Sequence, residues 1–227
     1  MPICYHAAVK FSGARIIAFD NDGTLYPAGA EVCMSVLEAH RVYVREHGLG
    51  LETPDIRWVQ KHIGADAKEF YSLMMPGQPR SVVDDFEDYC LHHEKGAIDT
   101  RPHLYEGAVE LLSALKDAGR ILLLVSNGSP RYLKHIWDAA GYGEWFSQMY
   151  PYGPPDYGTK GERLKLAHED WGGGAAVMIG DRRSDWEAAQ HAGLPFIGCR
   201  YGYGEDSELS DADHVVDDIS ELRDVLL

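Results

Sequence analysis

The sequence predicts an α/β protein built on a doubly wound parallel sheet, with a block of helices inserted after the first strand. Three observations support this fold class. Uninterrupted apolar runs recur along the chain, helical patterns separate the later runs, and no strand-like alternation occurs over residues 30–99. The apolar runs are Ile16–Phe19, Ile121–Val125 and Ala175–Ile179. Such runs are typical of parallel strands that are covered on both faces.

The first apolar run ends in two carboxylates, Asp20 and Asp22, which are followed by Gly23 and Thr24. Because ligands bind beyond the carboxyl ends of parallel strands, we expect both carboxylates to face a ligand crevice. Carboxylates suit Mg²⁺, and one of them can also act as a nucleophile. Gly23 allows a sharp exit from the strand, and Thr24 offers a hydroxyl to a phosphate oxygen. A hydrophilic surface turn is the alternative, since Asn-Asp and Asp-Gly pairs favour turns.

Helical spacing dominates the next part of the chain, from Ala30 to Asp99. Glycine or proline follows most of the expected helices, and Thr53 is expected to cap the second of them. The expected helices cover residues 30–47, 54–63, 66–75 and 81–95. This block separates the first strand from the remaining strands.

The second half of the chain returns to alternating helices and strands. Two strand ends again carry polar residues: Ser126, Asn127 and Gly128 follow one run, and Asp181 follows another. A hydroxyl and backbone N–H groups at such a point can hold a phosphate oxygen, although serine and asparagine are also common helix caps. Further helices are expected over residues 108–118, 131–140, 161–169, 186–191 and 219–226, and further strands over 196–198 and 214–216.

Composition narrows the classes of partner and compartment. The chain of 227 residues is 45% hydrophobic, with a formal net charge of −15, which argues against nucleic acid or an anionic membrane as the main partner. The four cysteines form no Cys-x-x-Cys pair, so neither a zinc site nor a disulfide framework is indicated. We expect a cytoplasmic protein. Residues 1–14 are either a leader or include an edge strand near residues 7–11.

The residues Asp20-Asn21-Asp22-Gly23-Thr24-Leu25 match the first motif of the haloacid dehalogenase (HAD) superfamily, particularly its phosphatase branch. Three later stretches match in the same order: Ser126 after its strand, Lys160 before a helix, and the Gly-Asp-x-x-x-Asp pattern at residues 180–185. The sequence departs from the family pattern at Glu106 and Gly161, where proline is usual. The helical block resembles the cap of the phosphoglycolate-phosphatase-like subgroup.

This resemblance implies a HAD-like Rossmannoid core formed by residues 1–29 and 100–227, with an inserted α-helical cap domain over residues 30–99. It also implies a Mg²⁺-dependent phosphatase that hydrolyses a small phosphomonoester metabolite, such as a phosphoglycolate-like compound or a sugar phosphate, through an aspartyl phosphate. A phosphomutase acting on a sugar phosphate is the alternative within the family. A catalytically silent module that binds phosphorylated metabolites is the alternative outside enzymes.

The family motifs also imply a role for each matching residue. Asp20 would be the nucleophile, Asp22 the acid and base, and Lys160 the group that neutralises negative charge, with Lys165 as a rival for that position. The phosphate would be bound by Thr24, Ser126, Asn127 and Gly128. The metal ligands would be Asp20, Asp22 through its backbone carbonyl, Asp181 and Asp185, which would act through water or orient the lysine. Candidates for contacting an anionic substrate from the cap are Arg57, Lys61, His62 and Lys68, which equally fit a solvated helix face.

Overall fold

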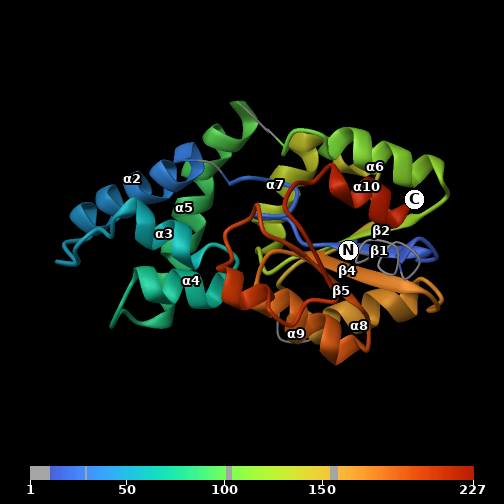
Figure 1. Ribbon diagram of the computed structural model, residues 1–227. Helices are drawn as coiled ribbons and strands as arrows, with labels where there is room; N and C mark the ends of the chain where they lie inside the picture. The colour runs from blue at the N-terminus through green and yellow to red at the C-terminus, as the bar shows by residue number, and fades with distance from the viewer. Residues whose placement is uncertain (1–10, 29, 101–103, 154–157) are drawn as a thin grey trace.

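The computed structural model describes residues 11–28, 30–100, 104–153 and 158–227, and it contains a six-stranded parallel sheet (Figure 1). The strand order is β3-β2-β1-β4-β5-β6. The strands are β1 (Ile16–Phe19), β2 (Ile121–Val125), β3 (Gln148–Tyr150), β4 (Ala176–Gly180), β5 (Phe196–Cys199) and β6 (His214–Val216). The predicted α/β class with a parallel sheet is confirmed.

Strand β1 lies at the centre of the sheet, where the direction of strand addition reverses. Its first residue, Ile16, is in register with Ile121 of β2 on one side and Ala176 of β4 on the other. Later strands are added outward from β2 and from β4. The carboxyl ends of β1, β2 and β4 therefore meet at a topological switch point, the usual place for a ligand in an open α/β sheet.

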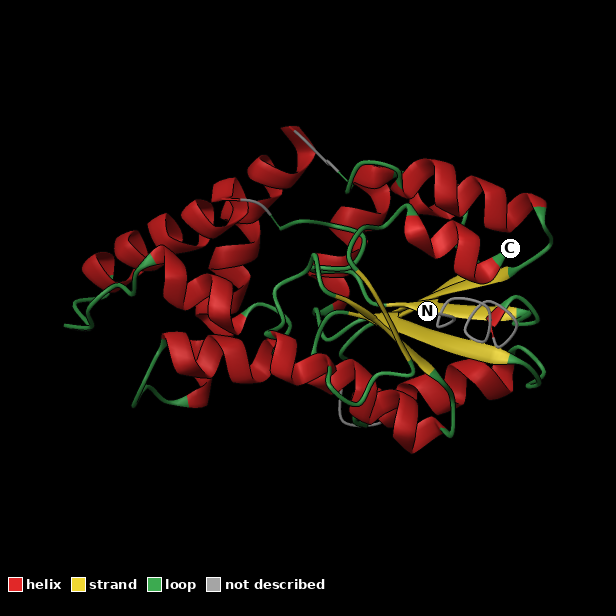
Figure 2. Ribbon diagram, viewed as in Figure 1, coloured by secondary structure: helices red, strands yellow, loops and turns green. Residues whose placement is uncertain are grey.

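Helices cover both faces of the sheet, so the core has three layers (Figure 2). Along β1, Ile17 and Phe19 belong to one hydrophobic cluster, and Ile16 and Ala18 belong to the other. The first cluster includes residues of α6 (Ala108–Asp117), α7 (Pro130–Ala140) and α10 (Glu221–Leu226). The second includes residues of α8 (Lys160–Asp170) and α9 (Arg183–Ala192). Burial on both faces explains why the strands are continuously apolar.

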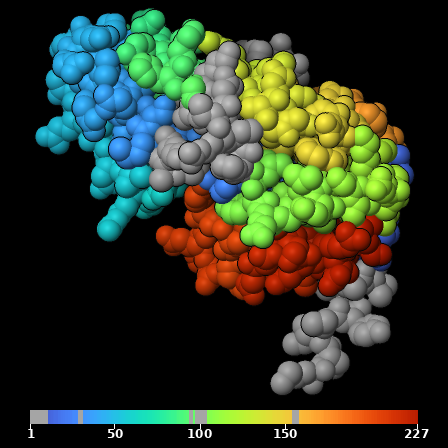
Figure 3. All heavy atoms as spheres, turned by 90° about the horizontal axis from the view of Figure 1, so that it is seen from above, coloured from blue at the N-terminus to red at the C-terminus, as the bar shows by residue number. Residues whose placement is uncertain are grey.

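Helices α2 to α5 form a helical unit beyond one end of the sheet, and Figure 3 shows it beside the mass of the core. The helices of this unit are α2 (Ala30–Glu46), α3 (Ile56–His62), α4 (Ala67–Met74) and α5 (Arg80–Thr100). They pack around hydrophobic clusters of their own, in which Tyr43, Tyr71 and Phe86 are buried. The unit therefore has an internal core that the sheet does not supply.

Several element boundaries differ from those predicted. The side chain of Asp55 caps α3, whereas Thr53 was expected to do so, and the helix begins at Ile56. Helix α5 continues through Gly96 to Thr100, and β3 was not predicted because it is only three residues long. The short helices η1 (Tyr142–Glu144) and η3 (Asp206–Leu209) were also not predicted.

The possible edge strand near residues 7–11 lies outside the described residues, apart from Phe11, which is buried in the core. Cys33, Cys90 and Cys199 are buried and are not joined in disulfides. Among the described residues, no helix has the length and apolar character needed to span a membrane.

Candidate active site

Three adjacent strands deliver polar side chains to one edge of the sheet. Asp20 follows β1, Ser126 follows β2 and Asp181 follows β4 directly, and all three residues are buried. Residues of loops that follow neighbouring parallel strands meet at the switch point because the strands end side by side. The structure thus brings together residues that are 55 to 161 positions apart in the sequence.

A buried acidic cluster is formed by Asp20, Asp181 and Asp185, whose carboxylate oxygens lie within 4.8 Å of one another. Burial, together with repulsion from Asp185 and Asp22, raises the pKa of Asp20 to about 7, although Lys160 opposes this rise. Burial and the same kind of repulsion raise the pKa of Asp181 well above its ordinary value. Three buried carboxylates at this spacing fit a divalent cation that prefers oxygen ligands.

Lys160, and not Lys165, is the lysine that lies beside the acidic cluster. Lys160 is the first residue of α8, and its Nζ atom lies 2.7 Å from Oδ1 of Asp20 and 2.5 Å from Oδ1 of Asp185. Burial would lower the pKa of Lys160, but the two carboxylates outweigh it and raise the pKa, so the lysine stays charged. Lys165 is exposed to solvent. Helix α8 begins at this point because Thr159 and Glu162 form a capping box.

Asp22 lies beside this cluster but is not part of it. Its Oδ1 atom accepts hydrogen bonds from the Tyr132 hydroxyl at 2.6 Å and from the side-chain amide of Asn21 at 3.1 Å. Burial raises the pKa of Asp22 to about 6, although both hydrogen bonds lower it. The carboxylate of Asp22 is therefore placed for proton transfer, whereas its predicted role in metal binding would fall to its backbone carbonyl.

The structure places Thr24 differently from expectation. Its hydroxyl lies 3.3 Å from Oδ1 of Asp181 and donates a hydrogen bond to it, and the residue is fully buried. The backbone N–H of Tyr203 donates to the other oxygen of Asp181 at 2.7 Å. Thr24 thus contacts an acidic residue and is not among the residues that line the cavity described below.

The loop after β2 connects the core to the helical unit. Ser126 Oγ accepts a hydrogen bond from the N–H of Gly128 at 3.1 Å, and both residues line a cavity. Asn127 donates through its side chain to the carbonyl of Gly64 at 3.1 Å, and its own carbonyl accepts from the N–H of Ala67 at 3.1 Å. Asn127 therefore holds the helical unit against the end of the sheet.

Sequence reasoning missed Arg163, which is fully buried on α8. Its guanidinium donates to Oδ1 of Asn127 at 2.7 Å, and to the carbonyls of Ser126 at 3.2 Å and Gly158 at 2.8 Å. Arg163 follows Lys160 by three positions, so both side chains leave the same face of the helix. That spacing was the available signal, but an arginine in a polar helix is ordinarily exposed.

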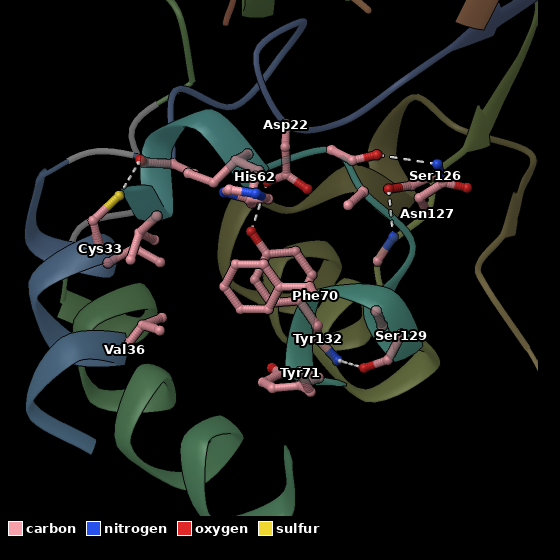
Figure 4. Close-up of a pocket in the computed structure, with 18 of the residues that line it drawn as sticks. Asp22, Cys33, Val36, His62, Phe70, Tyr71, Ser126, Asn127, Ser129 and Tyr132 are labelled. Carbon is pink, nitrogen blue, oxygen red and sulfur yellow. Dashed lines mark hydrogen bonds between the residues drawn. The ribbon is translucent and has the colours of Figure 1, made fainter. Parts of the chain in front are cut away.

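A cavity of about 80 Å³ lies between the core and the helical unit (Figure 4). Asp20, Asp22 and Ser126 line it from the core, and residues of α2, α3 and α4 line it from the helical unit. Of the predicted cationic contacts, only His62 lines this cavity, whereas Arg57, Lys61 and Lys68 are exposed. Lys61 also lines a neighbouring cavity of about 670 Å³, whereas Arg57 and Lys68 line neither cavity.

Comparison with known proteins agrees with this arrangement. The model of the haloacid dehalogenase-like hydrolase family matches residues 14–193. The phosphoglycolate phosphatase of Photobacterium profundum is 30% identical, over 96% of this chain and 97% of its own. That of Escherichia coli strain K12 is 28% identical, over 96% of this chain and 94% of its own.

A solved structure shows the same fold. The crystal structure of CbbY from Rhodobacter sphaeroides in complex with xylulose-(1,5)bisphosphate superposes with a TM-score of 0.78 at 19% identity, covering 94% of this chain and all of that one. The matched family region includes the acidic cluster, Lys160 and the loop after β2. The chain therefore belongs to the haloacid dehalogenase-like hydrolase family, and its relatives identify it as a phosphatase of that family.

Proposed function

We propose that this protein is a Mg²⁺-dependent phosphatase that hydrolyses a small phosphomonoester through an aspartyl phosphate on Asp20. One observation carries the proposal: the Asp20 carboxylate borders a cavity, is paired with the buried ammonium of Lys160, and has the acid Asp22 beside it in the same cavity wall. A nucleophile, a positive charge and a proton donor at one strand end are what phosphoryl transfer needs.

The acidic cluster would hold Mg²⁺ through Asp20 and Asp181, together with the backbone carbonyl of Asp22. Once bound, the cation would supply charge neutralisation to the phosphoryl oxygens. Asp185 already pairs with Lys160 and accepts a hydrogen bond from the N–H of Arg182 at 2.9 Å. Its role would accordingly be to fix the lysine, with any contact to the cation made through water.

The reaction would proceed in two steps on this chain's own residues. A carboxylate oxygen of Asp20 forms a bond to phosphorus while the bond from phosphorus to the leaving oxygen breaks, and Asp22 gives its proton to that oxygen. In the second step Asp22 takes a proton from water, whose oxygen attacks phosphorus and releases inorganic phosphate and Asp20. A pKa of about 6 suits Asp22 to both directions of transfer near neutral pH.

Ser126 and the N–H groups of Asn127 and Gly128 would bind the transferred phosphoryl group. The Ser126 hydroxyl lines the same cavity as Asp20, and its oxygen already accepts the N–H of Gly128, so its own proton is available to a phosphate oxygen. Lys160 would lower the negative charge around the nucleophile. These contacts come from the loop after β2 and the start of α8, which Arg163 ties together.

We further propose that residues 30–99 form a cap domain on a core made of residues 1–29 and 100–227. The cavity lies between the two parts, and the helical unit forms much of its wall. A leaving group bound there would be shielded from water, which strengthens the electrostatic interactions of the site.

The test is release of inorganic phosphate from a panel of small phosphomonoesters, with Mg²⁺ and with EDTA, by the wild type and by Asp20→Asn. We expect metal-dependent turnover that the substitution abolishes, and a phosphorylated enzyme that forms only with Asp20 present. An isomerised sugar phosphate without phosphate release would identify a mutase. No turnover of any substrate would favour the binding module.

Metal binding is tested separately by thermal unfolding with and without Mg²⁺. We expect Mg²⁺ to raise the melting temperature of the wild type, because a ligand that binds the folded state stabilises it. Asp181→Asn should remove this shift, whereas Asp211→Asn, which changes a carboxylate outside the cluster, should retain it. An unchanged shift in the first variant would place the cation elsewhere.

A further inference from the structure

The wall of the 80 Å³ cavity on the side of the helical unit is mostly apolar, with His62 and Tyr71 as its polar side chains. Cys33 and Val36 of α2 and Phe70 of α4 belong to this wall (Figure 4), and Val32 of α2 and Val59 of α3 also line the cavity. The polar groups gather at the opposite end, where the strands of the core finish. A substrate in this cavity would therefore have its phosphoryl group at the polar end and its leaving group among apolar side chains.

No lysine or arginine lines this cavity among the described residues. Of the two carboxylates that line it, Asp20 is paired with Lys160, whereas Asp22 has no cationic partner in the described part of the chain and would repel a second anion when ionised. His62 is the one basic side chain among the described lining residues. Its Nδ1 atom lies 2.7 Å from the carbonyl of Trp58 and donates to it, which leaves Nε2 for the cavity. The chain's net charge of −15 adds to the repulsion.

Asp22 fixes the position of the leaving group. A general acid must lie within hydrogen-bond distance of the oxygen that it protonates. Asp22 lines the 80 Å³ cavity but not the neighbouring cavity of about 670 Å³, which Lys61, Lys160 and Arg182 line. The larger cavity contains both cationic and acidic side chains, and neither Asp20 nor Asp22 lines it. The leaving oxygen consequently belongs in the smaller, apolar cavity.

We propose that the substrate is the phosphomonoester of a small uncharged alcohol, and not of an acid or of a second phosphate. This proposal rests on the proposed phosphatase function. An unpaired carboxylate in such a cavity loses its hydration without gaining a cation, whereas CH₂ and CH₃ groups gain from burial. The cavity has a volume of only about 80 Å³, which favours a short leaving group.

The experiment compares substrates that differ only in the charge of the leaving group. Phosphoglycolate carries a carboxylate where ethyl phosphate carries a methyl group, and propyl phosphate extends the apolar chain. We expect kcat/KM for both neutral esters to exceed that for phosphoglycolate at least tenfold. A kcat/KM for phosphoglycolate equal to or above that of the neutral esters would overturn the proposal.

Variants of the cavity wall test the cause of this preference. Phe70→Arg places a cation beside the leaving group and should reduce the neutral preference or reverse it, whereas Phe70→Leu should keep it. His62→Arg would also place a cation beside the leaving group, from α3, and it replaces Phe70→Arg in the test if that variant does not fold. His62→Gln should also retain the preference for neutral esters. A wild-type preference for phosphoglycolate that is lost in His62→Gln would show that His62 supplies the charge, contrary to the proposal.

The larger cavity provides the remaining control. Lys61→Ala should leave the ratio of the substrates unchanged, because Lys61 lines only that cavity. A loss of phosphoglycolate turnover in Lys61→Ala would place the leaving group there and overturn the proposal. No turnover of any ester with Mg²⁺ would contradict the proposed phosphatase function itself. Turnover that favours phosphoglycolate would contradict only the proposal of a neutral leaving group.

Discussion

The ammonium group of Lys160 lies 2.7 Å from the carboxylate of Asp20, and both side chains are almost completely buried. The same ammonium also contacts Asp185. A single cation thus compensates two of the three carboxylates in the acidic cluster. This pairing favours the ionised form of Asp20, because Lys160 lowers the pKa that burial raises.

Replacement of Lys160 by methionine should therefore damage both activity and stability. We expect kcat to fall by about 10²–10³, the usual effect of losing a group that stabilises transition-state charge. We also expect the free energy of unfolding in EDTA to fall by about 3 kcal/mol, because two buried carboxylates lose their partner. Urea unfolding and phosphate release measure these effects. Lys165→Met is the matched control, and equal losses in the two variants would contradict the assignment.

The hydroxyl of Tyr132 should set the pH dependence of the acid. It donates to Asp22 and stabilises the ionised carboxylate, which lowers the pKa of Asp22. In Tyr132→Phe that pKa rises, so Asp22 stays protonated to higher pH. We expect the alkaline limb of kcat/KM against pH to move upward by about one pH unit. A limb that stays in place would assign proton donation to another group.

The buried guanidinium of Arg163 should position the phosphate-binding loop. Arg163→Met would leave the acceptors on Asn127 and Gly158 without their donor, and we expect unfolding to become easier by about 3 kcal/mol. Because the loop after β2 would loosen, kcat should fall about tenfold at a temperature where the variant is folded. Arg163→Lys should recover part of both losses. Unchanged kinetics in the methionine variant would limit Arg163 to a structural role.

The helical unit should lose stability as the pH falls, because of His40. This ring is buried on α2, with Nε2 3.0 Å from the carbonyl of Met74 and Nδ1 3.1 Å from the hydroxyl of Thr53. Burial lowers its pKa below the ordinary 6.5. Below pH 6.5 the unfolded chain therefore binds a proton that the folded protein does not, and the free energy of unfolding decreases.

Because of His40, we expect the free energy of unfolding to fall by about 1 kcal/mol between pH 7 and pH 5. Urea unfolding followed across that range should show the slope in the wild type and a flatter slope in His40→Gln. The exposed His92 of α5 provides the control, since His92→Gln should keep the wild-type slope. The same slope in all three proteins would show that the pH dependence arises elsewhere.

Local sequence patterns determined the elements and most of the residues at the strand ends. The apolar runs before Asp20, Ser126 and Asp181 are contiguous in the sequence, so strand and strand end could be recognised together. Strand β3 was not predicted, because a strand of three residues is too short to show a periodic apolar pattern. Exact helix starts depended on individual capping hydrogen bonds, as with Asp55.

The sequence by itself determined the fold class and the group of residues that meets at the end of the sheet, because both follow from apolar periodicity and short motifs. Only the tertiary structure decided which of these residues touch. In the structure Lys160, and not Lys165, contacts Asp20, and the hydroxyl of Thr24 contacts Asp181. Arg163 is buried and donates a hydrogen bond to the loop after β2. These outcomes depend on distances between segments far apart in the chain, and a local pattern does not contain such distances.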